Sequence, residues 1–175
     1  VTMPHKQDVA RLVDRLDPAA RALDSVNTVS WDGDDLVGSS TDGVGFVASL
    51  TDAGVEVAGA RVAIIGAGGA ARSVIDALAR AAVPDICVLN RSAERAEQAA
   101  ALASVASPGI VSDITRADIV INATSVGMGG LADDPSTPLP CEADLFRDGQ
   151  VIADLIFHPL ETRWMRVARE LGLRT

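Results

Sequence analysis

The chain has 175 residues, of which 48% are hydrophobic and only 3% aromatic, and its formal net charge is −9. This apolar fraction is too high for a disordered chain, and the acidic balance indicates no basic face for a nucleic-acid duplex. Cys87 and Cys141 form no CxxC pair, so neither a disulfide framework nor a metal site is predicted. No apolar run reaches the roughly 18 residues of a membrane helix and no signal peptide opens the chain, so we expect a cytoplasmic protein.

The chain opens without an initiator methionine, and we interpret residue 1 as a truncation point or a start within a domain. Pro4 is expected to turn the chain. Apolar positions in residues 9–16 recur at helical spacing, and Asp17-Pro18 is expected to end that helix. Residues 26–31 and the segment from Leu36 predict a hairpin with its turn at Asp32-Gly33. A helix should follow from Thr41, with Thr41 or Asp42 as its cap.

From Arg61 the pattern alternates strands with helices. The segment "RVAIIGAGGAARSVIDALARAAV" predicts a strand, a glycine turn and a helix, and "DICVLNRSAERAEQAAALA" repeats that order. Two further strands are predicted in "ADIVINATSVGM" and "GQVIADLIFHP", and a helix that ends at Gly172 closes the chain. The intervening "LADDPSTPLP" is typical of a loop. This alternation predicts an α/β fold with a Rossmann-like, doubly wound parallel sheet.

The glycine turn "IIGAGGAAR" predicts a dinucleotide site. Gly66 ends the strand, Gly68 permits close approach of a pyrophosphate, and Gly69 and Ala70 open the helix. Ala71 stands where a third glycine is usual, and its small side chain still lets helix and strand pack closely. The free N–H groups of the helix would bind the phosphates. The alternative is a glycine turn without a ligand.

The end of the next strand predicts which dinucleotide is bound. An acidic residue there would bind the ribose 2′-OH of NAD and repel the extra phosphate of NADP. The chain instead has Asn90, followed by Arg91 and Arg95, whose guanidiniums are suited to a 2′-phosphate. We therefore predict NADP rather than NAD. The alternative is two solvated arginines, with Glu94 and Glu97 nearby.

Two further motifs, "VTMPHK" and "STDGVGF", contain Lys6 and Asp42. A lysine and an aspartate on the two edges of a cleft could together manage a proton during carbonyl reduction. By spacing alone, Lys6 is equally well a surface charge and Asp42 an N-cap. His5 precedes Lys6 in a segment expected to be extended, so the two side chains should point to opposite faces. We therefore interpret His5 as peripheral.

These motifs, together with "SVNTV", "NRSAERA", "INATSVGM" and "DLIFHPLET" in this order, resemble the shikimate dehydrogenase family. The resemblance implies that Lys6 is catalytic and Asp42 its partner, and that "VTMPHK", with Thr2, lies on the substrate side. It also implies that Asn27 binds substrate hydroxyls and that Asn122 and Thr124 lie beside the cofactor. Phe157 occupies a substrate-side position that often holds a tyrosine.

The implied activity is NADP-dependent, reversible reduction of 3-dehydroshikimate to shikimate, in the biosynthesis of aromatic amino acids. Ser40, where the family usually has asparagine, and Phe157 leave open a different ring acid such as quinate. A non-catalytic NADP-binding module is the third reading, because family segments that carry paired serines and a glutamine for the substrate are absent from these residues. The small-molecule substrate is the expected partner, with no nucleic acid or membrane, and a homodimer is left open.

The resemblance also implies two domains. Residues 1–42 would be part of a smaller α/β domain for substrate binding and catalysis, and residues 43–175 would be the NADP-binding domain. The reaction should then take place in the cleft between them, beyond the carboxyl ends of the strands.

Overall fold

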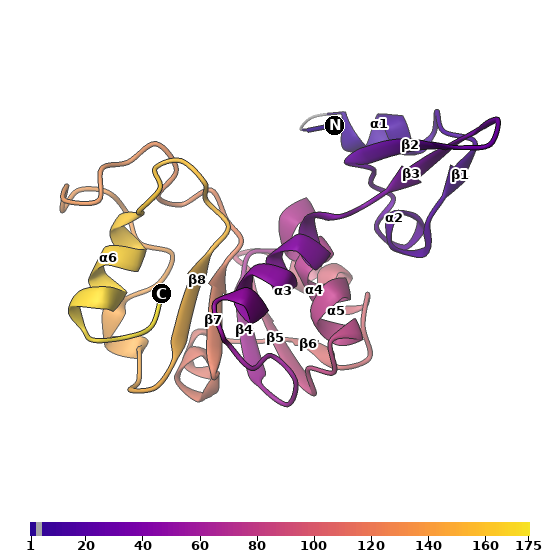
Figure 1. The fold of residues 1–175 in the computed structure, drawn as a ribbon. Helices are drawn as coiled ribbons and strands as arrows, with labels where there is room; N and C mark the ends of the chain where they lie inside the picture. Colours follow the sequence, from indigo (N-terminus) through magenta and orange to yellow (C-terminus); the bar gives the residue numbers. More distant parts are fainter. Residues whose placement is uncertain (3–4) are drawn as a thin grey trace.

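The computed structural model describes residues 1–2 and 5–175, so the turn expected at Pro4 lies outside the described residues (Figure 1). The N-terminal part contains α1 (Lys6–Ala10), β1 (Arg15–Leu16), α2 (Pro18–Leu23), β2 (Thr28–Asp32) and β3 (Asp35–Ser39). Its three strands form a sheet in the order β1-β3-β2, in which β3 is parallel to β1 and antiparallel to β2.

The predicted hairpin is confirmed, with its turn one residue later than expected. Asp32 pairs with Asp35, so Gly33 and Asp34 form the two-residue turn. Gly33 has φ 64°, a left-handed conformation that favours glycine.

The helix predicted over residues 9–16 is wrong, because α1 ends at Ala10 and the strand β1 follows it. Pro18 does not end a helix but begins α2. Proline suits the first turn of a helix, where its missing N–H would have no partner. The Asp17 carboxylate caps this helix by accepting a hydrogen bond of 2.6 Å from the Ala20 N–H.

The C-terminal part is built on a five-stranded sheet in which all neighbouring strands are parallel. The strand order is β6-β5-β4-β7-β8, so the chain reverses its direction across the sheet between β4 and β7. The predicted doubly wound sheet is confirmed, and this reversal is where such folds bind ligands. The strands are β4 (Arg61–Ile65), β5 (Asp85–Leu89), β6 (Ala106–Pro108), β7 (Ile119–Asn122) and β8 (Val151–Asp154).

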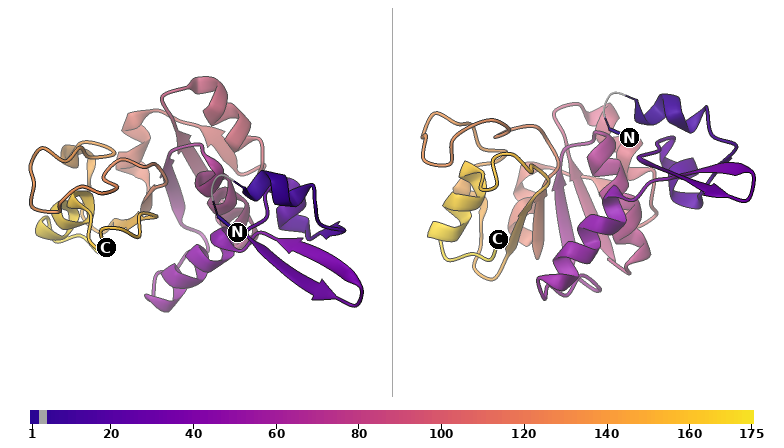
Figure 2. Two further views of the ribbon diagram at one scale, coloured as in Figure 1. Left: turned by 90° about the horizontal axis from the view of Figure 1, so that it is seen from above. Right: turned by 45° about the horizontal axis from the view of Figure 1, so that its top comes forward.

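Helices cover both faces of this sheet. The α-helices are α3 (Asp42–Asp52), α4 (Gly69–Arg80), α5 (Ala93–Ala100) and α6 (Arg163–Glu170), and the 3₁₀ helices are η1 (Val111–Arg116) and η2 (Ala143–Leu145). Figures 1 and 2 show α3, α4 and α5 on the side of the N-terminal part, and α6 at the opposite end of the molecule. Among the described residues, no helix has both the length and the apolar character needed to cross a bilayer.

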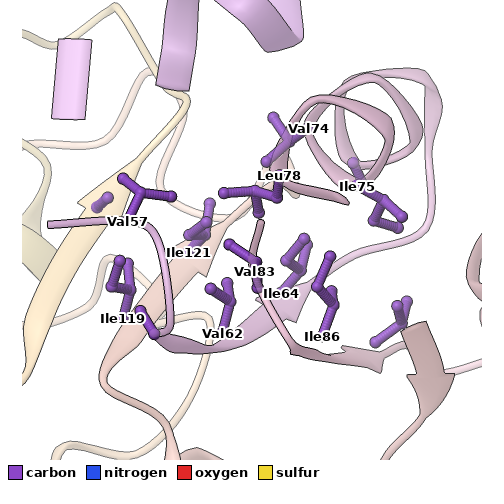
Figure 3. Packing of buried hydrophobic residues seen from close by; sticks show 14 of the residues in the cluster. Val57, Val62, Ile64, Val74, Ile75, Leu78, Val83, Ile86, Ile119 and Ile121 are labelled. Carbon is purple, nitrogen blue, oxygen red and sulfur yellow. The ribbon is translucent and has the colours of Figure 1, made fainter. Parts of the chain in front are cut away.

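The core lies on the two faces of β4 and its neighbours. Val62 and Ile64 are buried against the α4 side chains Val74 and Leu78 in a cluster of branched residues (Figure 3). The alternate residues of β4 join a second cluster around Trp164 on the other face. Burial on both faces explains why the strands read as continuous apolar runs.

The helices α3 and α4 approach each other closely at Gly43. The Gly43 N–H donates a hydrogen bond of 2.8 Å to the Ser73 Oγ. A Cβ at this position would lie 2.0 Å from the Ser73 carbonyl oxygen, so only glycine permits this crossing. The contact fixes the start of α3, and therefore Asp42, relative to the first turns of α4.

Candidate active site

Lys6, Asn27 and Asp42 are brought together from three separate segments. Lys6 begins α1, Asn27 precedes β2, and Asp42 begins α3. The Lys6 Nζ lies 2.5 Å from the Asp42 Oδ2, and the Asn27 Nδ2 donates a hydrogen bond of 2.5 Å to the Asp42 Oδ1. Both oxygens of the carboxylate are therefore engaged by donors, and the ammonium group is oriented by an ion pair.

Asn27 also fixes the segment that leads into α3. Its Oδ1 accepts hydrogen bonds from the Thr41 N–H and the Thr41 Oγ1, both at 3.1 Å, and from the Thr28 Oγ1 at 2.9 Å. These bonds hold Thr41 beside the hairpin and so position Asp42. Asn27 thus organises the Lys6–Asp42 pair.

The expectation that His5 and Lys6 lie in an extended segment is wrong. His5 has φ −88° and ψ −2°, a helical conformation, and Lys6 begins α1 directly after it. His5 is exposed, whereas the Lys6 side chain is only 26% exposed beside Asp42. The side chains of His5 and Lys6 therefore have different surroundings, although the segment is helical and not extended as expected.

The glycine turn between β4 and α4 follows its predicted geometry. Gly66 has φ 119°, and a Cβ there would lie 2.8 Å from the Ala123 carbonyl oxygen, so a side chain is excluded at this position. Gly68 and Gly69 are different, because a Cβ at either would meet no atom of residues 1–2 or 5–175 within 4 Å. The turn therefore presents its backbone to open space at the start of a helix of 12 residues, Gly69–Arg80.

One cavity of about 660 Å³ joins the glycine turn to Lys6. This volume is within the range of small-molecule sites. Its wall combines residues from the N-terminal part with residues from α4 and α5 of the parallel-sheet part. The lining residues are Lys6, Gln7, Leu23, Asp24, Ser25, Ala67, Gly68, Gly69, Arg72, Arg95 and Gln98.

The residues predicted to select the dinucleotide lie directly after β5 and in the first turn of α5. Asn90 follows this strand, and its Nδ2 donates a hydrogen bond of 3.0 Å to the Ser92 carbonyl. Arg95 lines the cavity, and Arg91 is exposed in the turn before α5. Among the described residues, neither arginine forms an ion pair with a carboxylate. Both charges are therefore free to meet an anion.

Asn122 and Thr124 shape the turn after β7. Asn122 is fully buried, and its Oδ1 accepts hydrogen bonds from the Thr124 N–H at 3.0 Å and the Thr124 Oγ1 at 2.7 Å. Its Nδ2 donates to the Val126 carbonyl at 3.2 Å and to the Asp154 Oδ1 at 3.0 Å. The side chain of Asn122 is thus used within the protein, and it positions a turn that lies against Gly66.

Asp154, at the end of β8, extends this network to the last helix. Its carboxylate accepts hydrogen bonds from the Ile156 N–H at 3.0 Å and the Thr162 Oγ1 at 2.8 Å, in addition to Asn122. Thr162 in turn caps α6 by accepting from the Met165 N–H. Burial raises the pKa of the Asp154 carboxyl above its ordinary value, against the lowering effect of these hydrogen bonds.

We expect the stability of the protein to reflect this raised pKa. The carboxyl contributes stability that is complete below its unfolded pKa of about 3.9 and is lost as the pH rises through the higher folded pKa. Asp154→Asn removes the titration, so the free energy of unfolding of the wild type, relative to the variant, should decrease as the pH rises from acidic to neutral. Urea unfolding at a series of pH values measures this difference, and a constant difference would contradict the assignment.

Thr2 and Phe157, the two other residues expected on the substrate side, are not among the residues that line the cavity with Lys6. Thr2 is exposed, and its carbonyl accepts a hydrogen bond of 3.0 Å from the His5 N–H. Phe157 follows β8 with its side chain 82% exposed, and it is not among the residues that line the cavity with Lys6. Ser40 is buried between β3 and α3.

The two cysteines are not candidates for nucleophilic chemistry. Cys87 is half-buried, and its thiol donates a hydrogen bond of 3.3 Å to the Asp113 carboxylate. Burial raises the pKa of Cys87 to about 12 and that of Cys141 to about 11, so both thiols are protonated at neutral pH. Cys87 lines a smaller cavity of about 240 Å³, together with residues at the start of β4 and β5. The arginines of that cavity pair with aspartates, Arg61 with Asp118 and Arg116 with Asp113.

Sequence reasoning missed three residues of this region: Arg72, Asp154 and Thr162. Arg72 is the last residue of the motif "GAGGAAR", and its positive charge lies in the first turns of the helix that follows the glycines. Asp154 is the polar residue that ends an apolar strand, and Thr162 precedes a helix at a capping position. These signals are visible in the sequence, but the sequence does not show the contacts of these residues, which join segments far apart in the chain.

The parallel sheet reverses its strand order between β4 and β7, with an open glycine turn at that point and, beside it, arginines that have no carboxylate partner in the described part of the chain. This arrangement defines a Rossmann-type dinucleotide-binding protein. Comparison with known proteins gives the family. The family model described as "Shikimate / quinate 5-dehydrogenase" matches residues 49–128, and that described as "Shikimate dehydrogenase substrate binding domain" matches residues 1–29. The chain belongs to the shikimate dehydrogenase family.

Individual relatives agree with this assignment. Shikimate dehydrogenase (NADP(+)) of Moorella thermoacetica is 43% identical over 185 residues, which cover 99% of this chain and 61% of the relative. The structure of shikimate 5-dehydrogenase from Listeria monocytogenes, in complex with shikimate and NAD, has a TM-score of 0.88 and 32% identity, and the match covers 100% of this chain and 65% of that one. For ligand-free 5-ketofructose reductase of a Gluconobacter strain the TM-score is 0.86 at 37% identity, covering 99% and 64%. The chain thus spans less than two thirds of the length of these relatives.

Proposed function

We propose that the protein carrying this chain is an NADP-dependent oxidoreductase that reversibly reduces 3-dehydroshikimate to shikimate in the biosynthesis of aromatic amino acids. The observation that supports this function most directly is the position of Lys6. Its ammonium, held 2.5 Å from the Asp42 carboxylate, lines the same cavity as Gly68 and Gly69. A proton donor and a dinucleotide turn therefore face one space.

The residues present fit a dinucleotide. Gly68 and Gly69 leave open space where any side chain would project, so a pyrophosphate can approach their backbone. The start of α4 supplies free N–H groups and the positive end of the helix dipole. When bound, NADPH would supply the hydride for the reduction. Asn90, Arg91 and Arg95 would lie at its adenosine end, and the Thr124 turn beside Gly66.

Lys6 and Asp42 have distinct roles in the proposed reduction. Negative charge grows on the carbonyl oxygen of the substrate as its carbon is reduced, and the Lys6 ammonium stabilises that charge and donates the proton that completes the hydroxyl. Asp42 orients the ammonium through their ion pair, and Asn27 holds Asp42. In the oxidative direction the Lys6 ammonium would first lose a proton to solvent, and the neutral amine would then accept the proton from the substrate hydroxyl.

The selection of NADP is attributed to Arg91 and Arg95. We expect Arg91→Ala and Arg95→Ala each to weaken NADP binding by about tenfold, because each removes a charge-assisted contact to the 2′-phosphate from an exposed position. NAD binding should change little. Isothermal titration calorimetry with both dinucleotides measures the effect, and unchanged NADP affinity in both variants would remove these arginines from the site.

The substrate is tested by a spectrophotometric assay of the protein with shikimate and with quinate, each with NADP and with NAD. Preferential oxidation of shikimate with NADP supports the proposal. Preferential oxidation of quinate would favour the alternative, a related ring-acid dehydrogenase. That alternative is kept because Ser40 is shorter than the family's usual asparagine and Phe157 has no hydroxyl to offer a substrate. NADP binding without oxidation of either compound would favour a non-catalytic dinucleotide-binding module.

We also propose that substrate binding and cofactor binding belong to two separate domains of the chain. Residues 1–42 carry Lys6, Asn27 and Asp42 and would belong to the substrate-binding domain, and residues 43–175 would form the NADP-binding domain. We place the protein in the cytoplasm, where its small-molecule ligands would be found. A homodimer remains part of the proposal, and light scattering in solution would test it.

A further inference from the structure

We propose that Arg72 is a third guanidinium for NADP and that it contacts the 2′-phosphate together with Arg95, an inference that rests on the proposed function. Arg72 lies in the first turns of α4, four residues after Gly68, and it lines the cavity of the glycine turn. Arg95 lines the same cavity from the neighbouring helix α5. Two cationic side chains from adjacent helices thus face one space.

The charge of Arg72 is not neutralised within the described part of the chain. No carboxylate there lies within ion-pair distance of its guanidinium, although the protein carries a net charge of −9 and seven of its fourteen arginines have acidic partners. On the same helix, Arg80 lies 3.0 Å from Asp76. The two cations that share the cavity repel each other until an anion lies between them.

A phosphomonoester is the anion that best suits this pair. It carries close to two negative charges at neutral pH and three acceptor oxygens, so two guanidiniums can bind it at the same time. The pyrophosphate bridge of a dinucleotide has a different site, because the backbone of Gly68 and Gly69 is open to it. Arg72 should therefore discriminate NADP from NAD rather than bind both.

Asp24 offers the competing explanation. It follows α2 in a left-handed conformation with φ 47°, and it lines the same cavity as Arg72. If Arg72 served to pair with Asp24 across the cavity, removing either partner would have the same effect on ligand binding. If Arg72 binds the phosphate, removing the Asp24 carboxylate should leave NADP affinity unchanged or increase it, because it withdraws a negative charge from the site.

The test is calorimetric titration of the protein with NADP, NAD and adenosine 2′,5′-bisphosphate, with circular dichroism to confirm folding. We expect Arg72→Gln to weaken the binding of NADP and of the bisphosphate by roughly 10- to 100-fold and that of NAD by less than about threefold. Arg72→Lys should recover part of the affinity, because it restores the charge without the planar fork. Arg80→Gln, on the same helix, is the matched control and should change none of the three affinities.

Each other outcome would overturn the assignment. Equal losses for NAD and NADP would place Arg72 on the pyrophosphate, and a loss in Asp24→Asn that matches the loss in Arg72→Gln would make the residue a partner of Asp24. Unchanged affinities in Arg72→Gln, with Arg95→Ala still weakening NADP, would reject this inference and leave the proposed function in place. A wild-type protein that binds NADP no more tightly than NAD would instead contradict the proposed cofactor itself.

Discussion

Replacing Lys6 with alanine should lower turnover by at least about 100-fold while leaving NADP binding nearly intact. In the proposed mechanism, the variant would lack both the charge that stabilises the developing oxyanion and the proton that completes the product. It leaves the glycine turn, Arg95 and the core unchanged. Steady-state kinetics and calorimetric titration of the same preparation separate the two effects.

The neighbouring His5→Ala provides the matched control for Lys6. His5 is exposed at the start of α1 and makes no side-chain cap to that helix, so we expect turnover close to that of the wild type. Asp42→Asn keeps the shape of the partner but removes its charge, and it should lower turnover less than the loss of Lys6 does. Full turnover in Lys6→Ala would exclude Lys6 from handling the proton and leave only a dinucleotide site.

Gly43→Ala should lower the free energy of unfolding by about 3 kcal/mol. The added methyl group would lie 2.0 Å from the Ser73 carbonyl oxygen, which belongs to the backbone of α4 and has no rotamer to change. The helices α3 and α4 must therefore separate, and the buried hydrogen bond from the Gly43 N–H to the Ser73 Oγ is stretched or lost. Urea unfolding of the wild type and the variant measures the loss.

Gly45→Ala on the same helix is the control for Gly43. A Cβ at Gly45 meets nothing within 4 Å, and alanine favours a helix over glycine by up to about 1 kcal/mol, so stability should be unchanged or slightly increased. Equal stability of Gly43→Ala and the wild type would contradict the close helix crossing. Because Asp42 precedes Gly43, the Gly43 variant should also lose turnover in the fraction that remains folded.

The parts of the fold predicted from the sequence are those fixed by local pattern. The strand, glycine turn and helix over residues 61–80 have an apolar period, special backbone positions and a helix start in a single stretch, and each signal indicates the same structure. The strand β6 was missed, because three residues that end in Pro108 have almost no pattern and form a strand only by pairing with β5. Pro18 was misread because proline at a helix start and proline after a helix end look alike without the Asp17 cap.

The candidate site was predicted unevenly for the same reason. The sequence placed Lys6 and Asp42 near each other only through the resemblance of their motifs to a family, because 36 residues separate them and no period links them. The hydrogen bonds of Asn27 to Thr41 and Asp42, and of Asp154 to Asn122, join segments far apart in the chain. Arg72 was visible in the motif, but only the fold shows that it lines the same cavity as Arg95.

The two donors on the Asp42 carboxylate have a further consequence for the entropy of the reaction. Lys6 and Asn27 hold both oxygens without any ligand, so the side-chain ordering that would otherwise oppose the transition state has already taken place during folding. A substrate that enters meets an ammonium already restricted to one orientation. In the proposed reaction, preorganisation of this kind would lower the barrier through the fixed geometry of the free protein, independently of how tightly the substrate itself is bound.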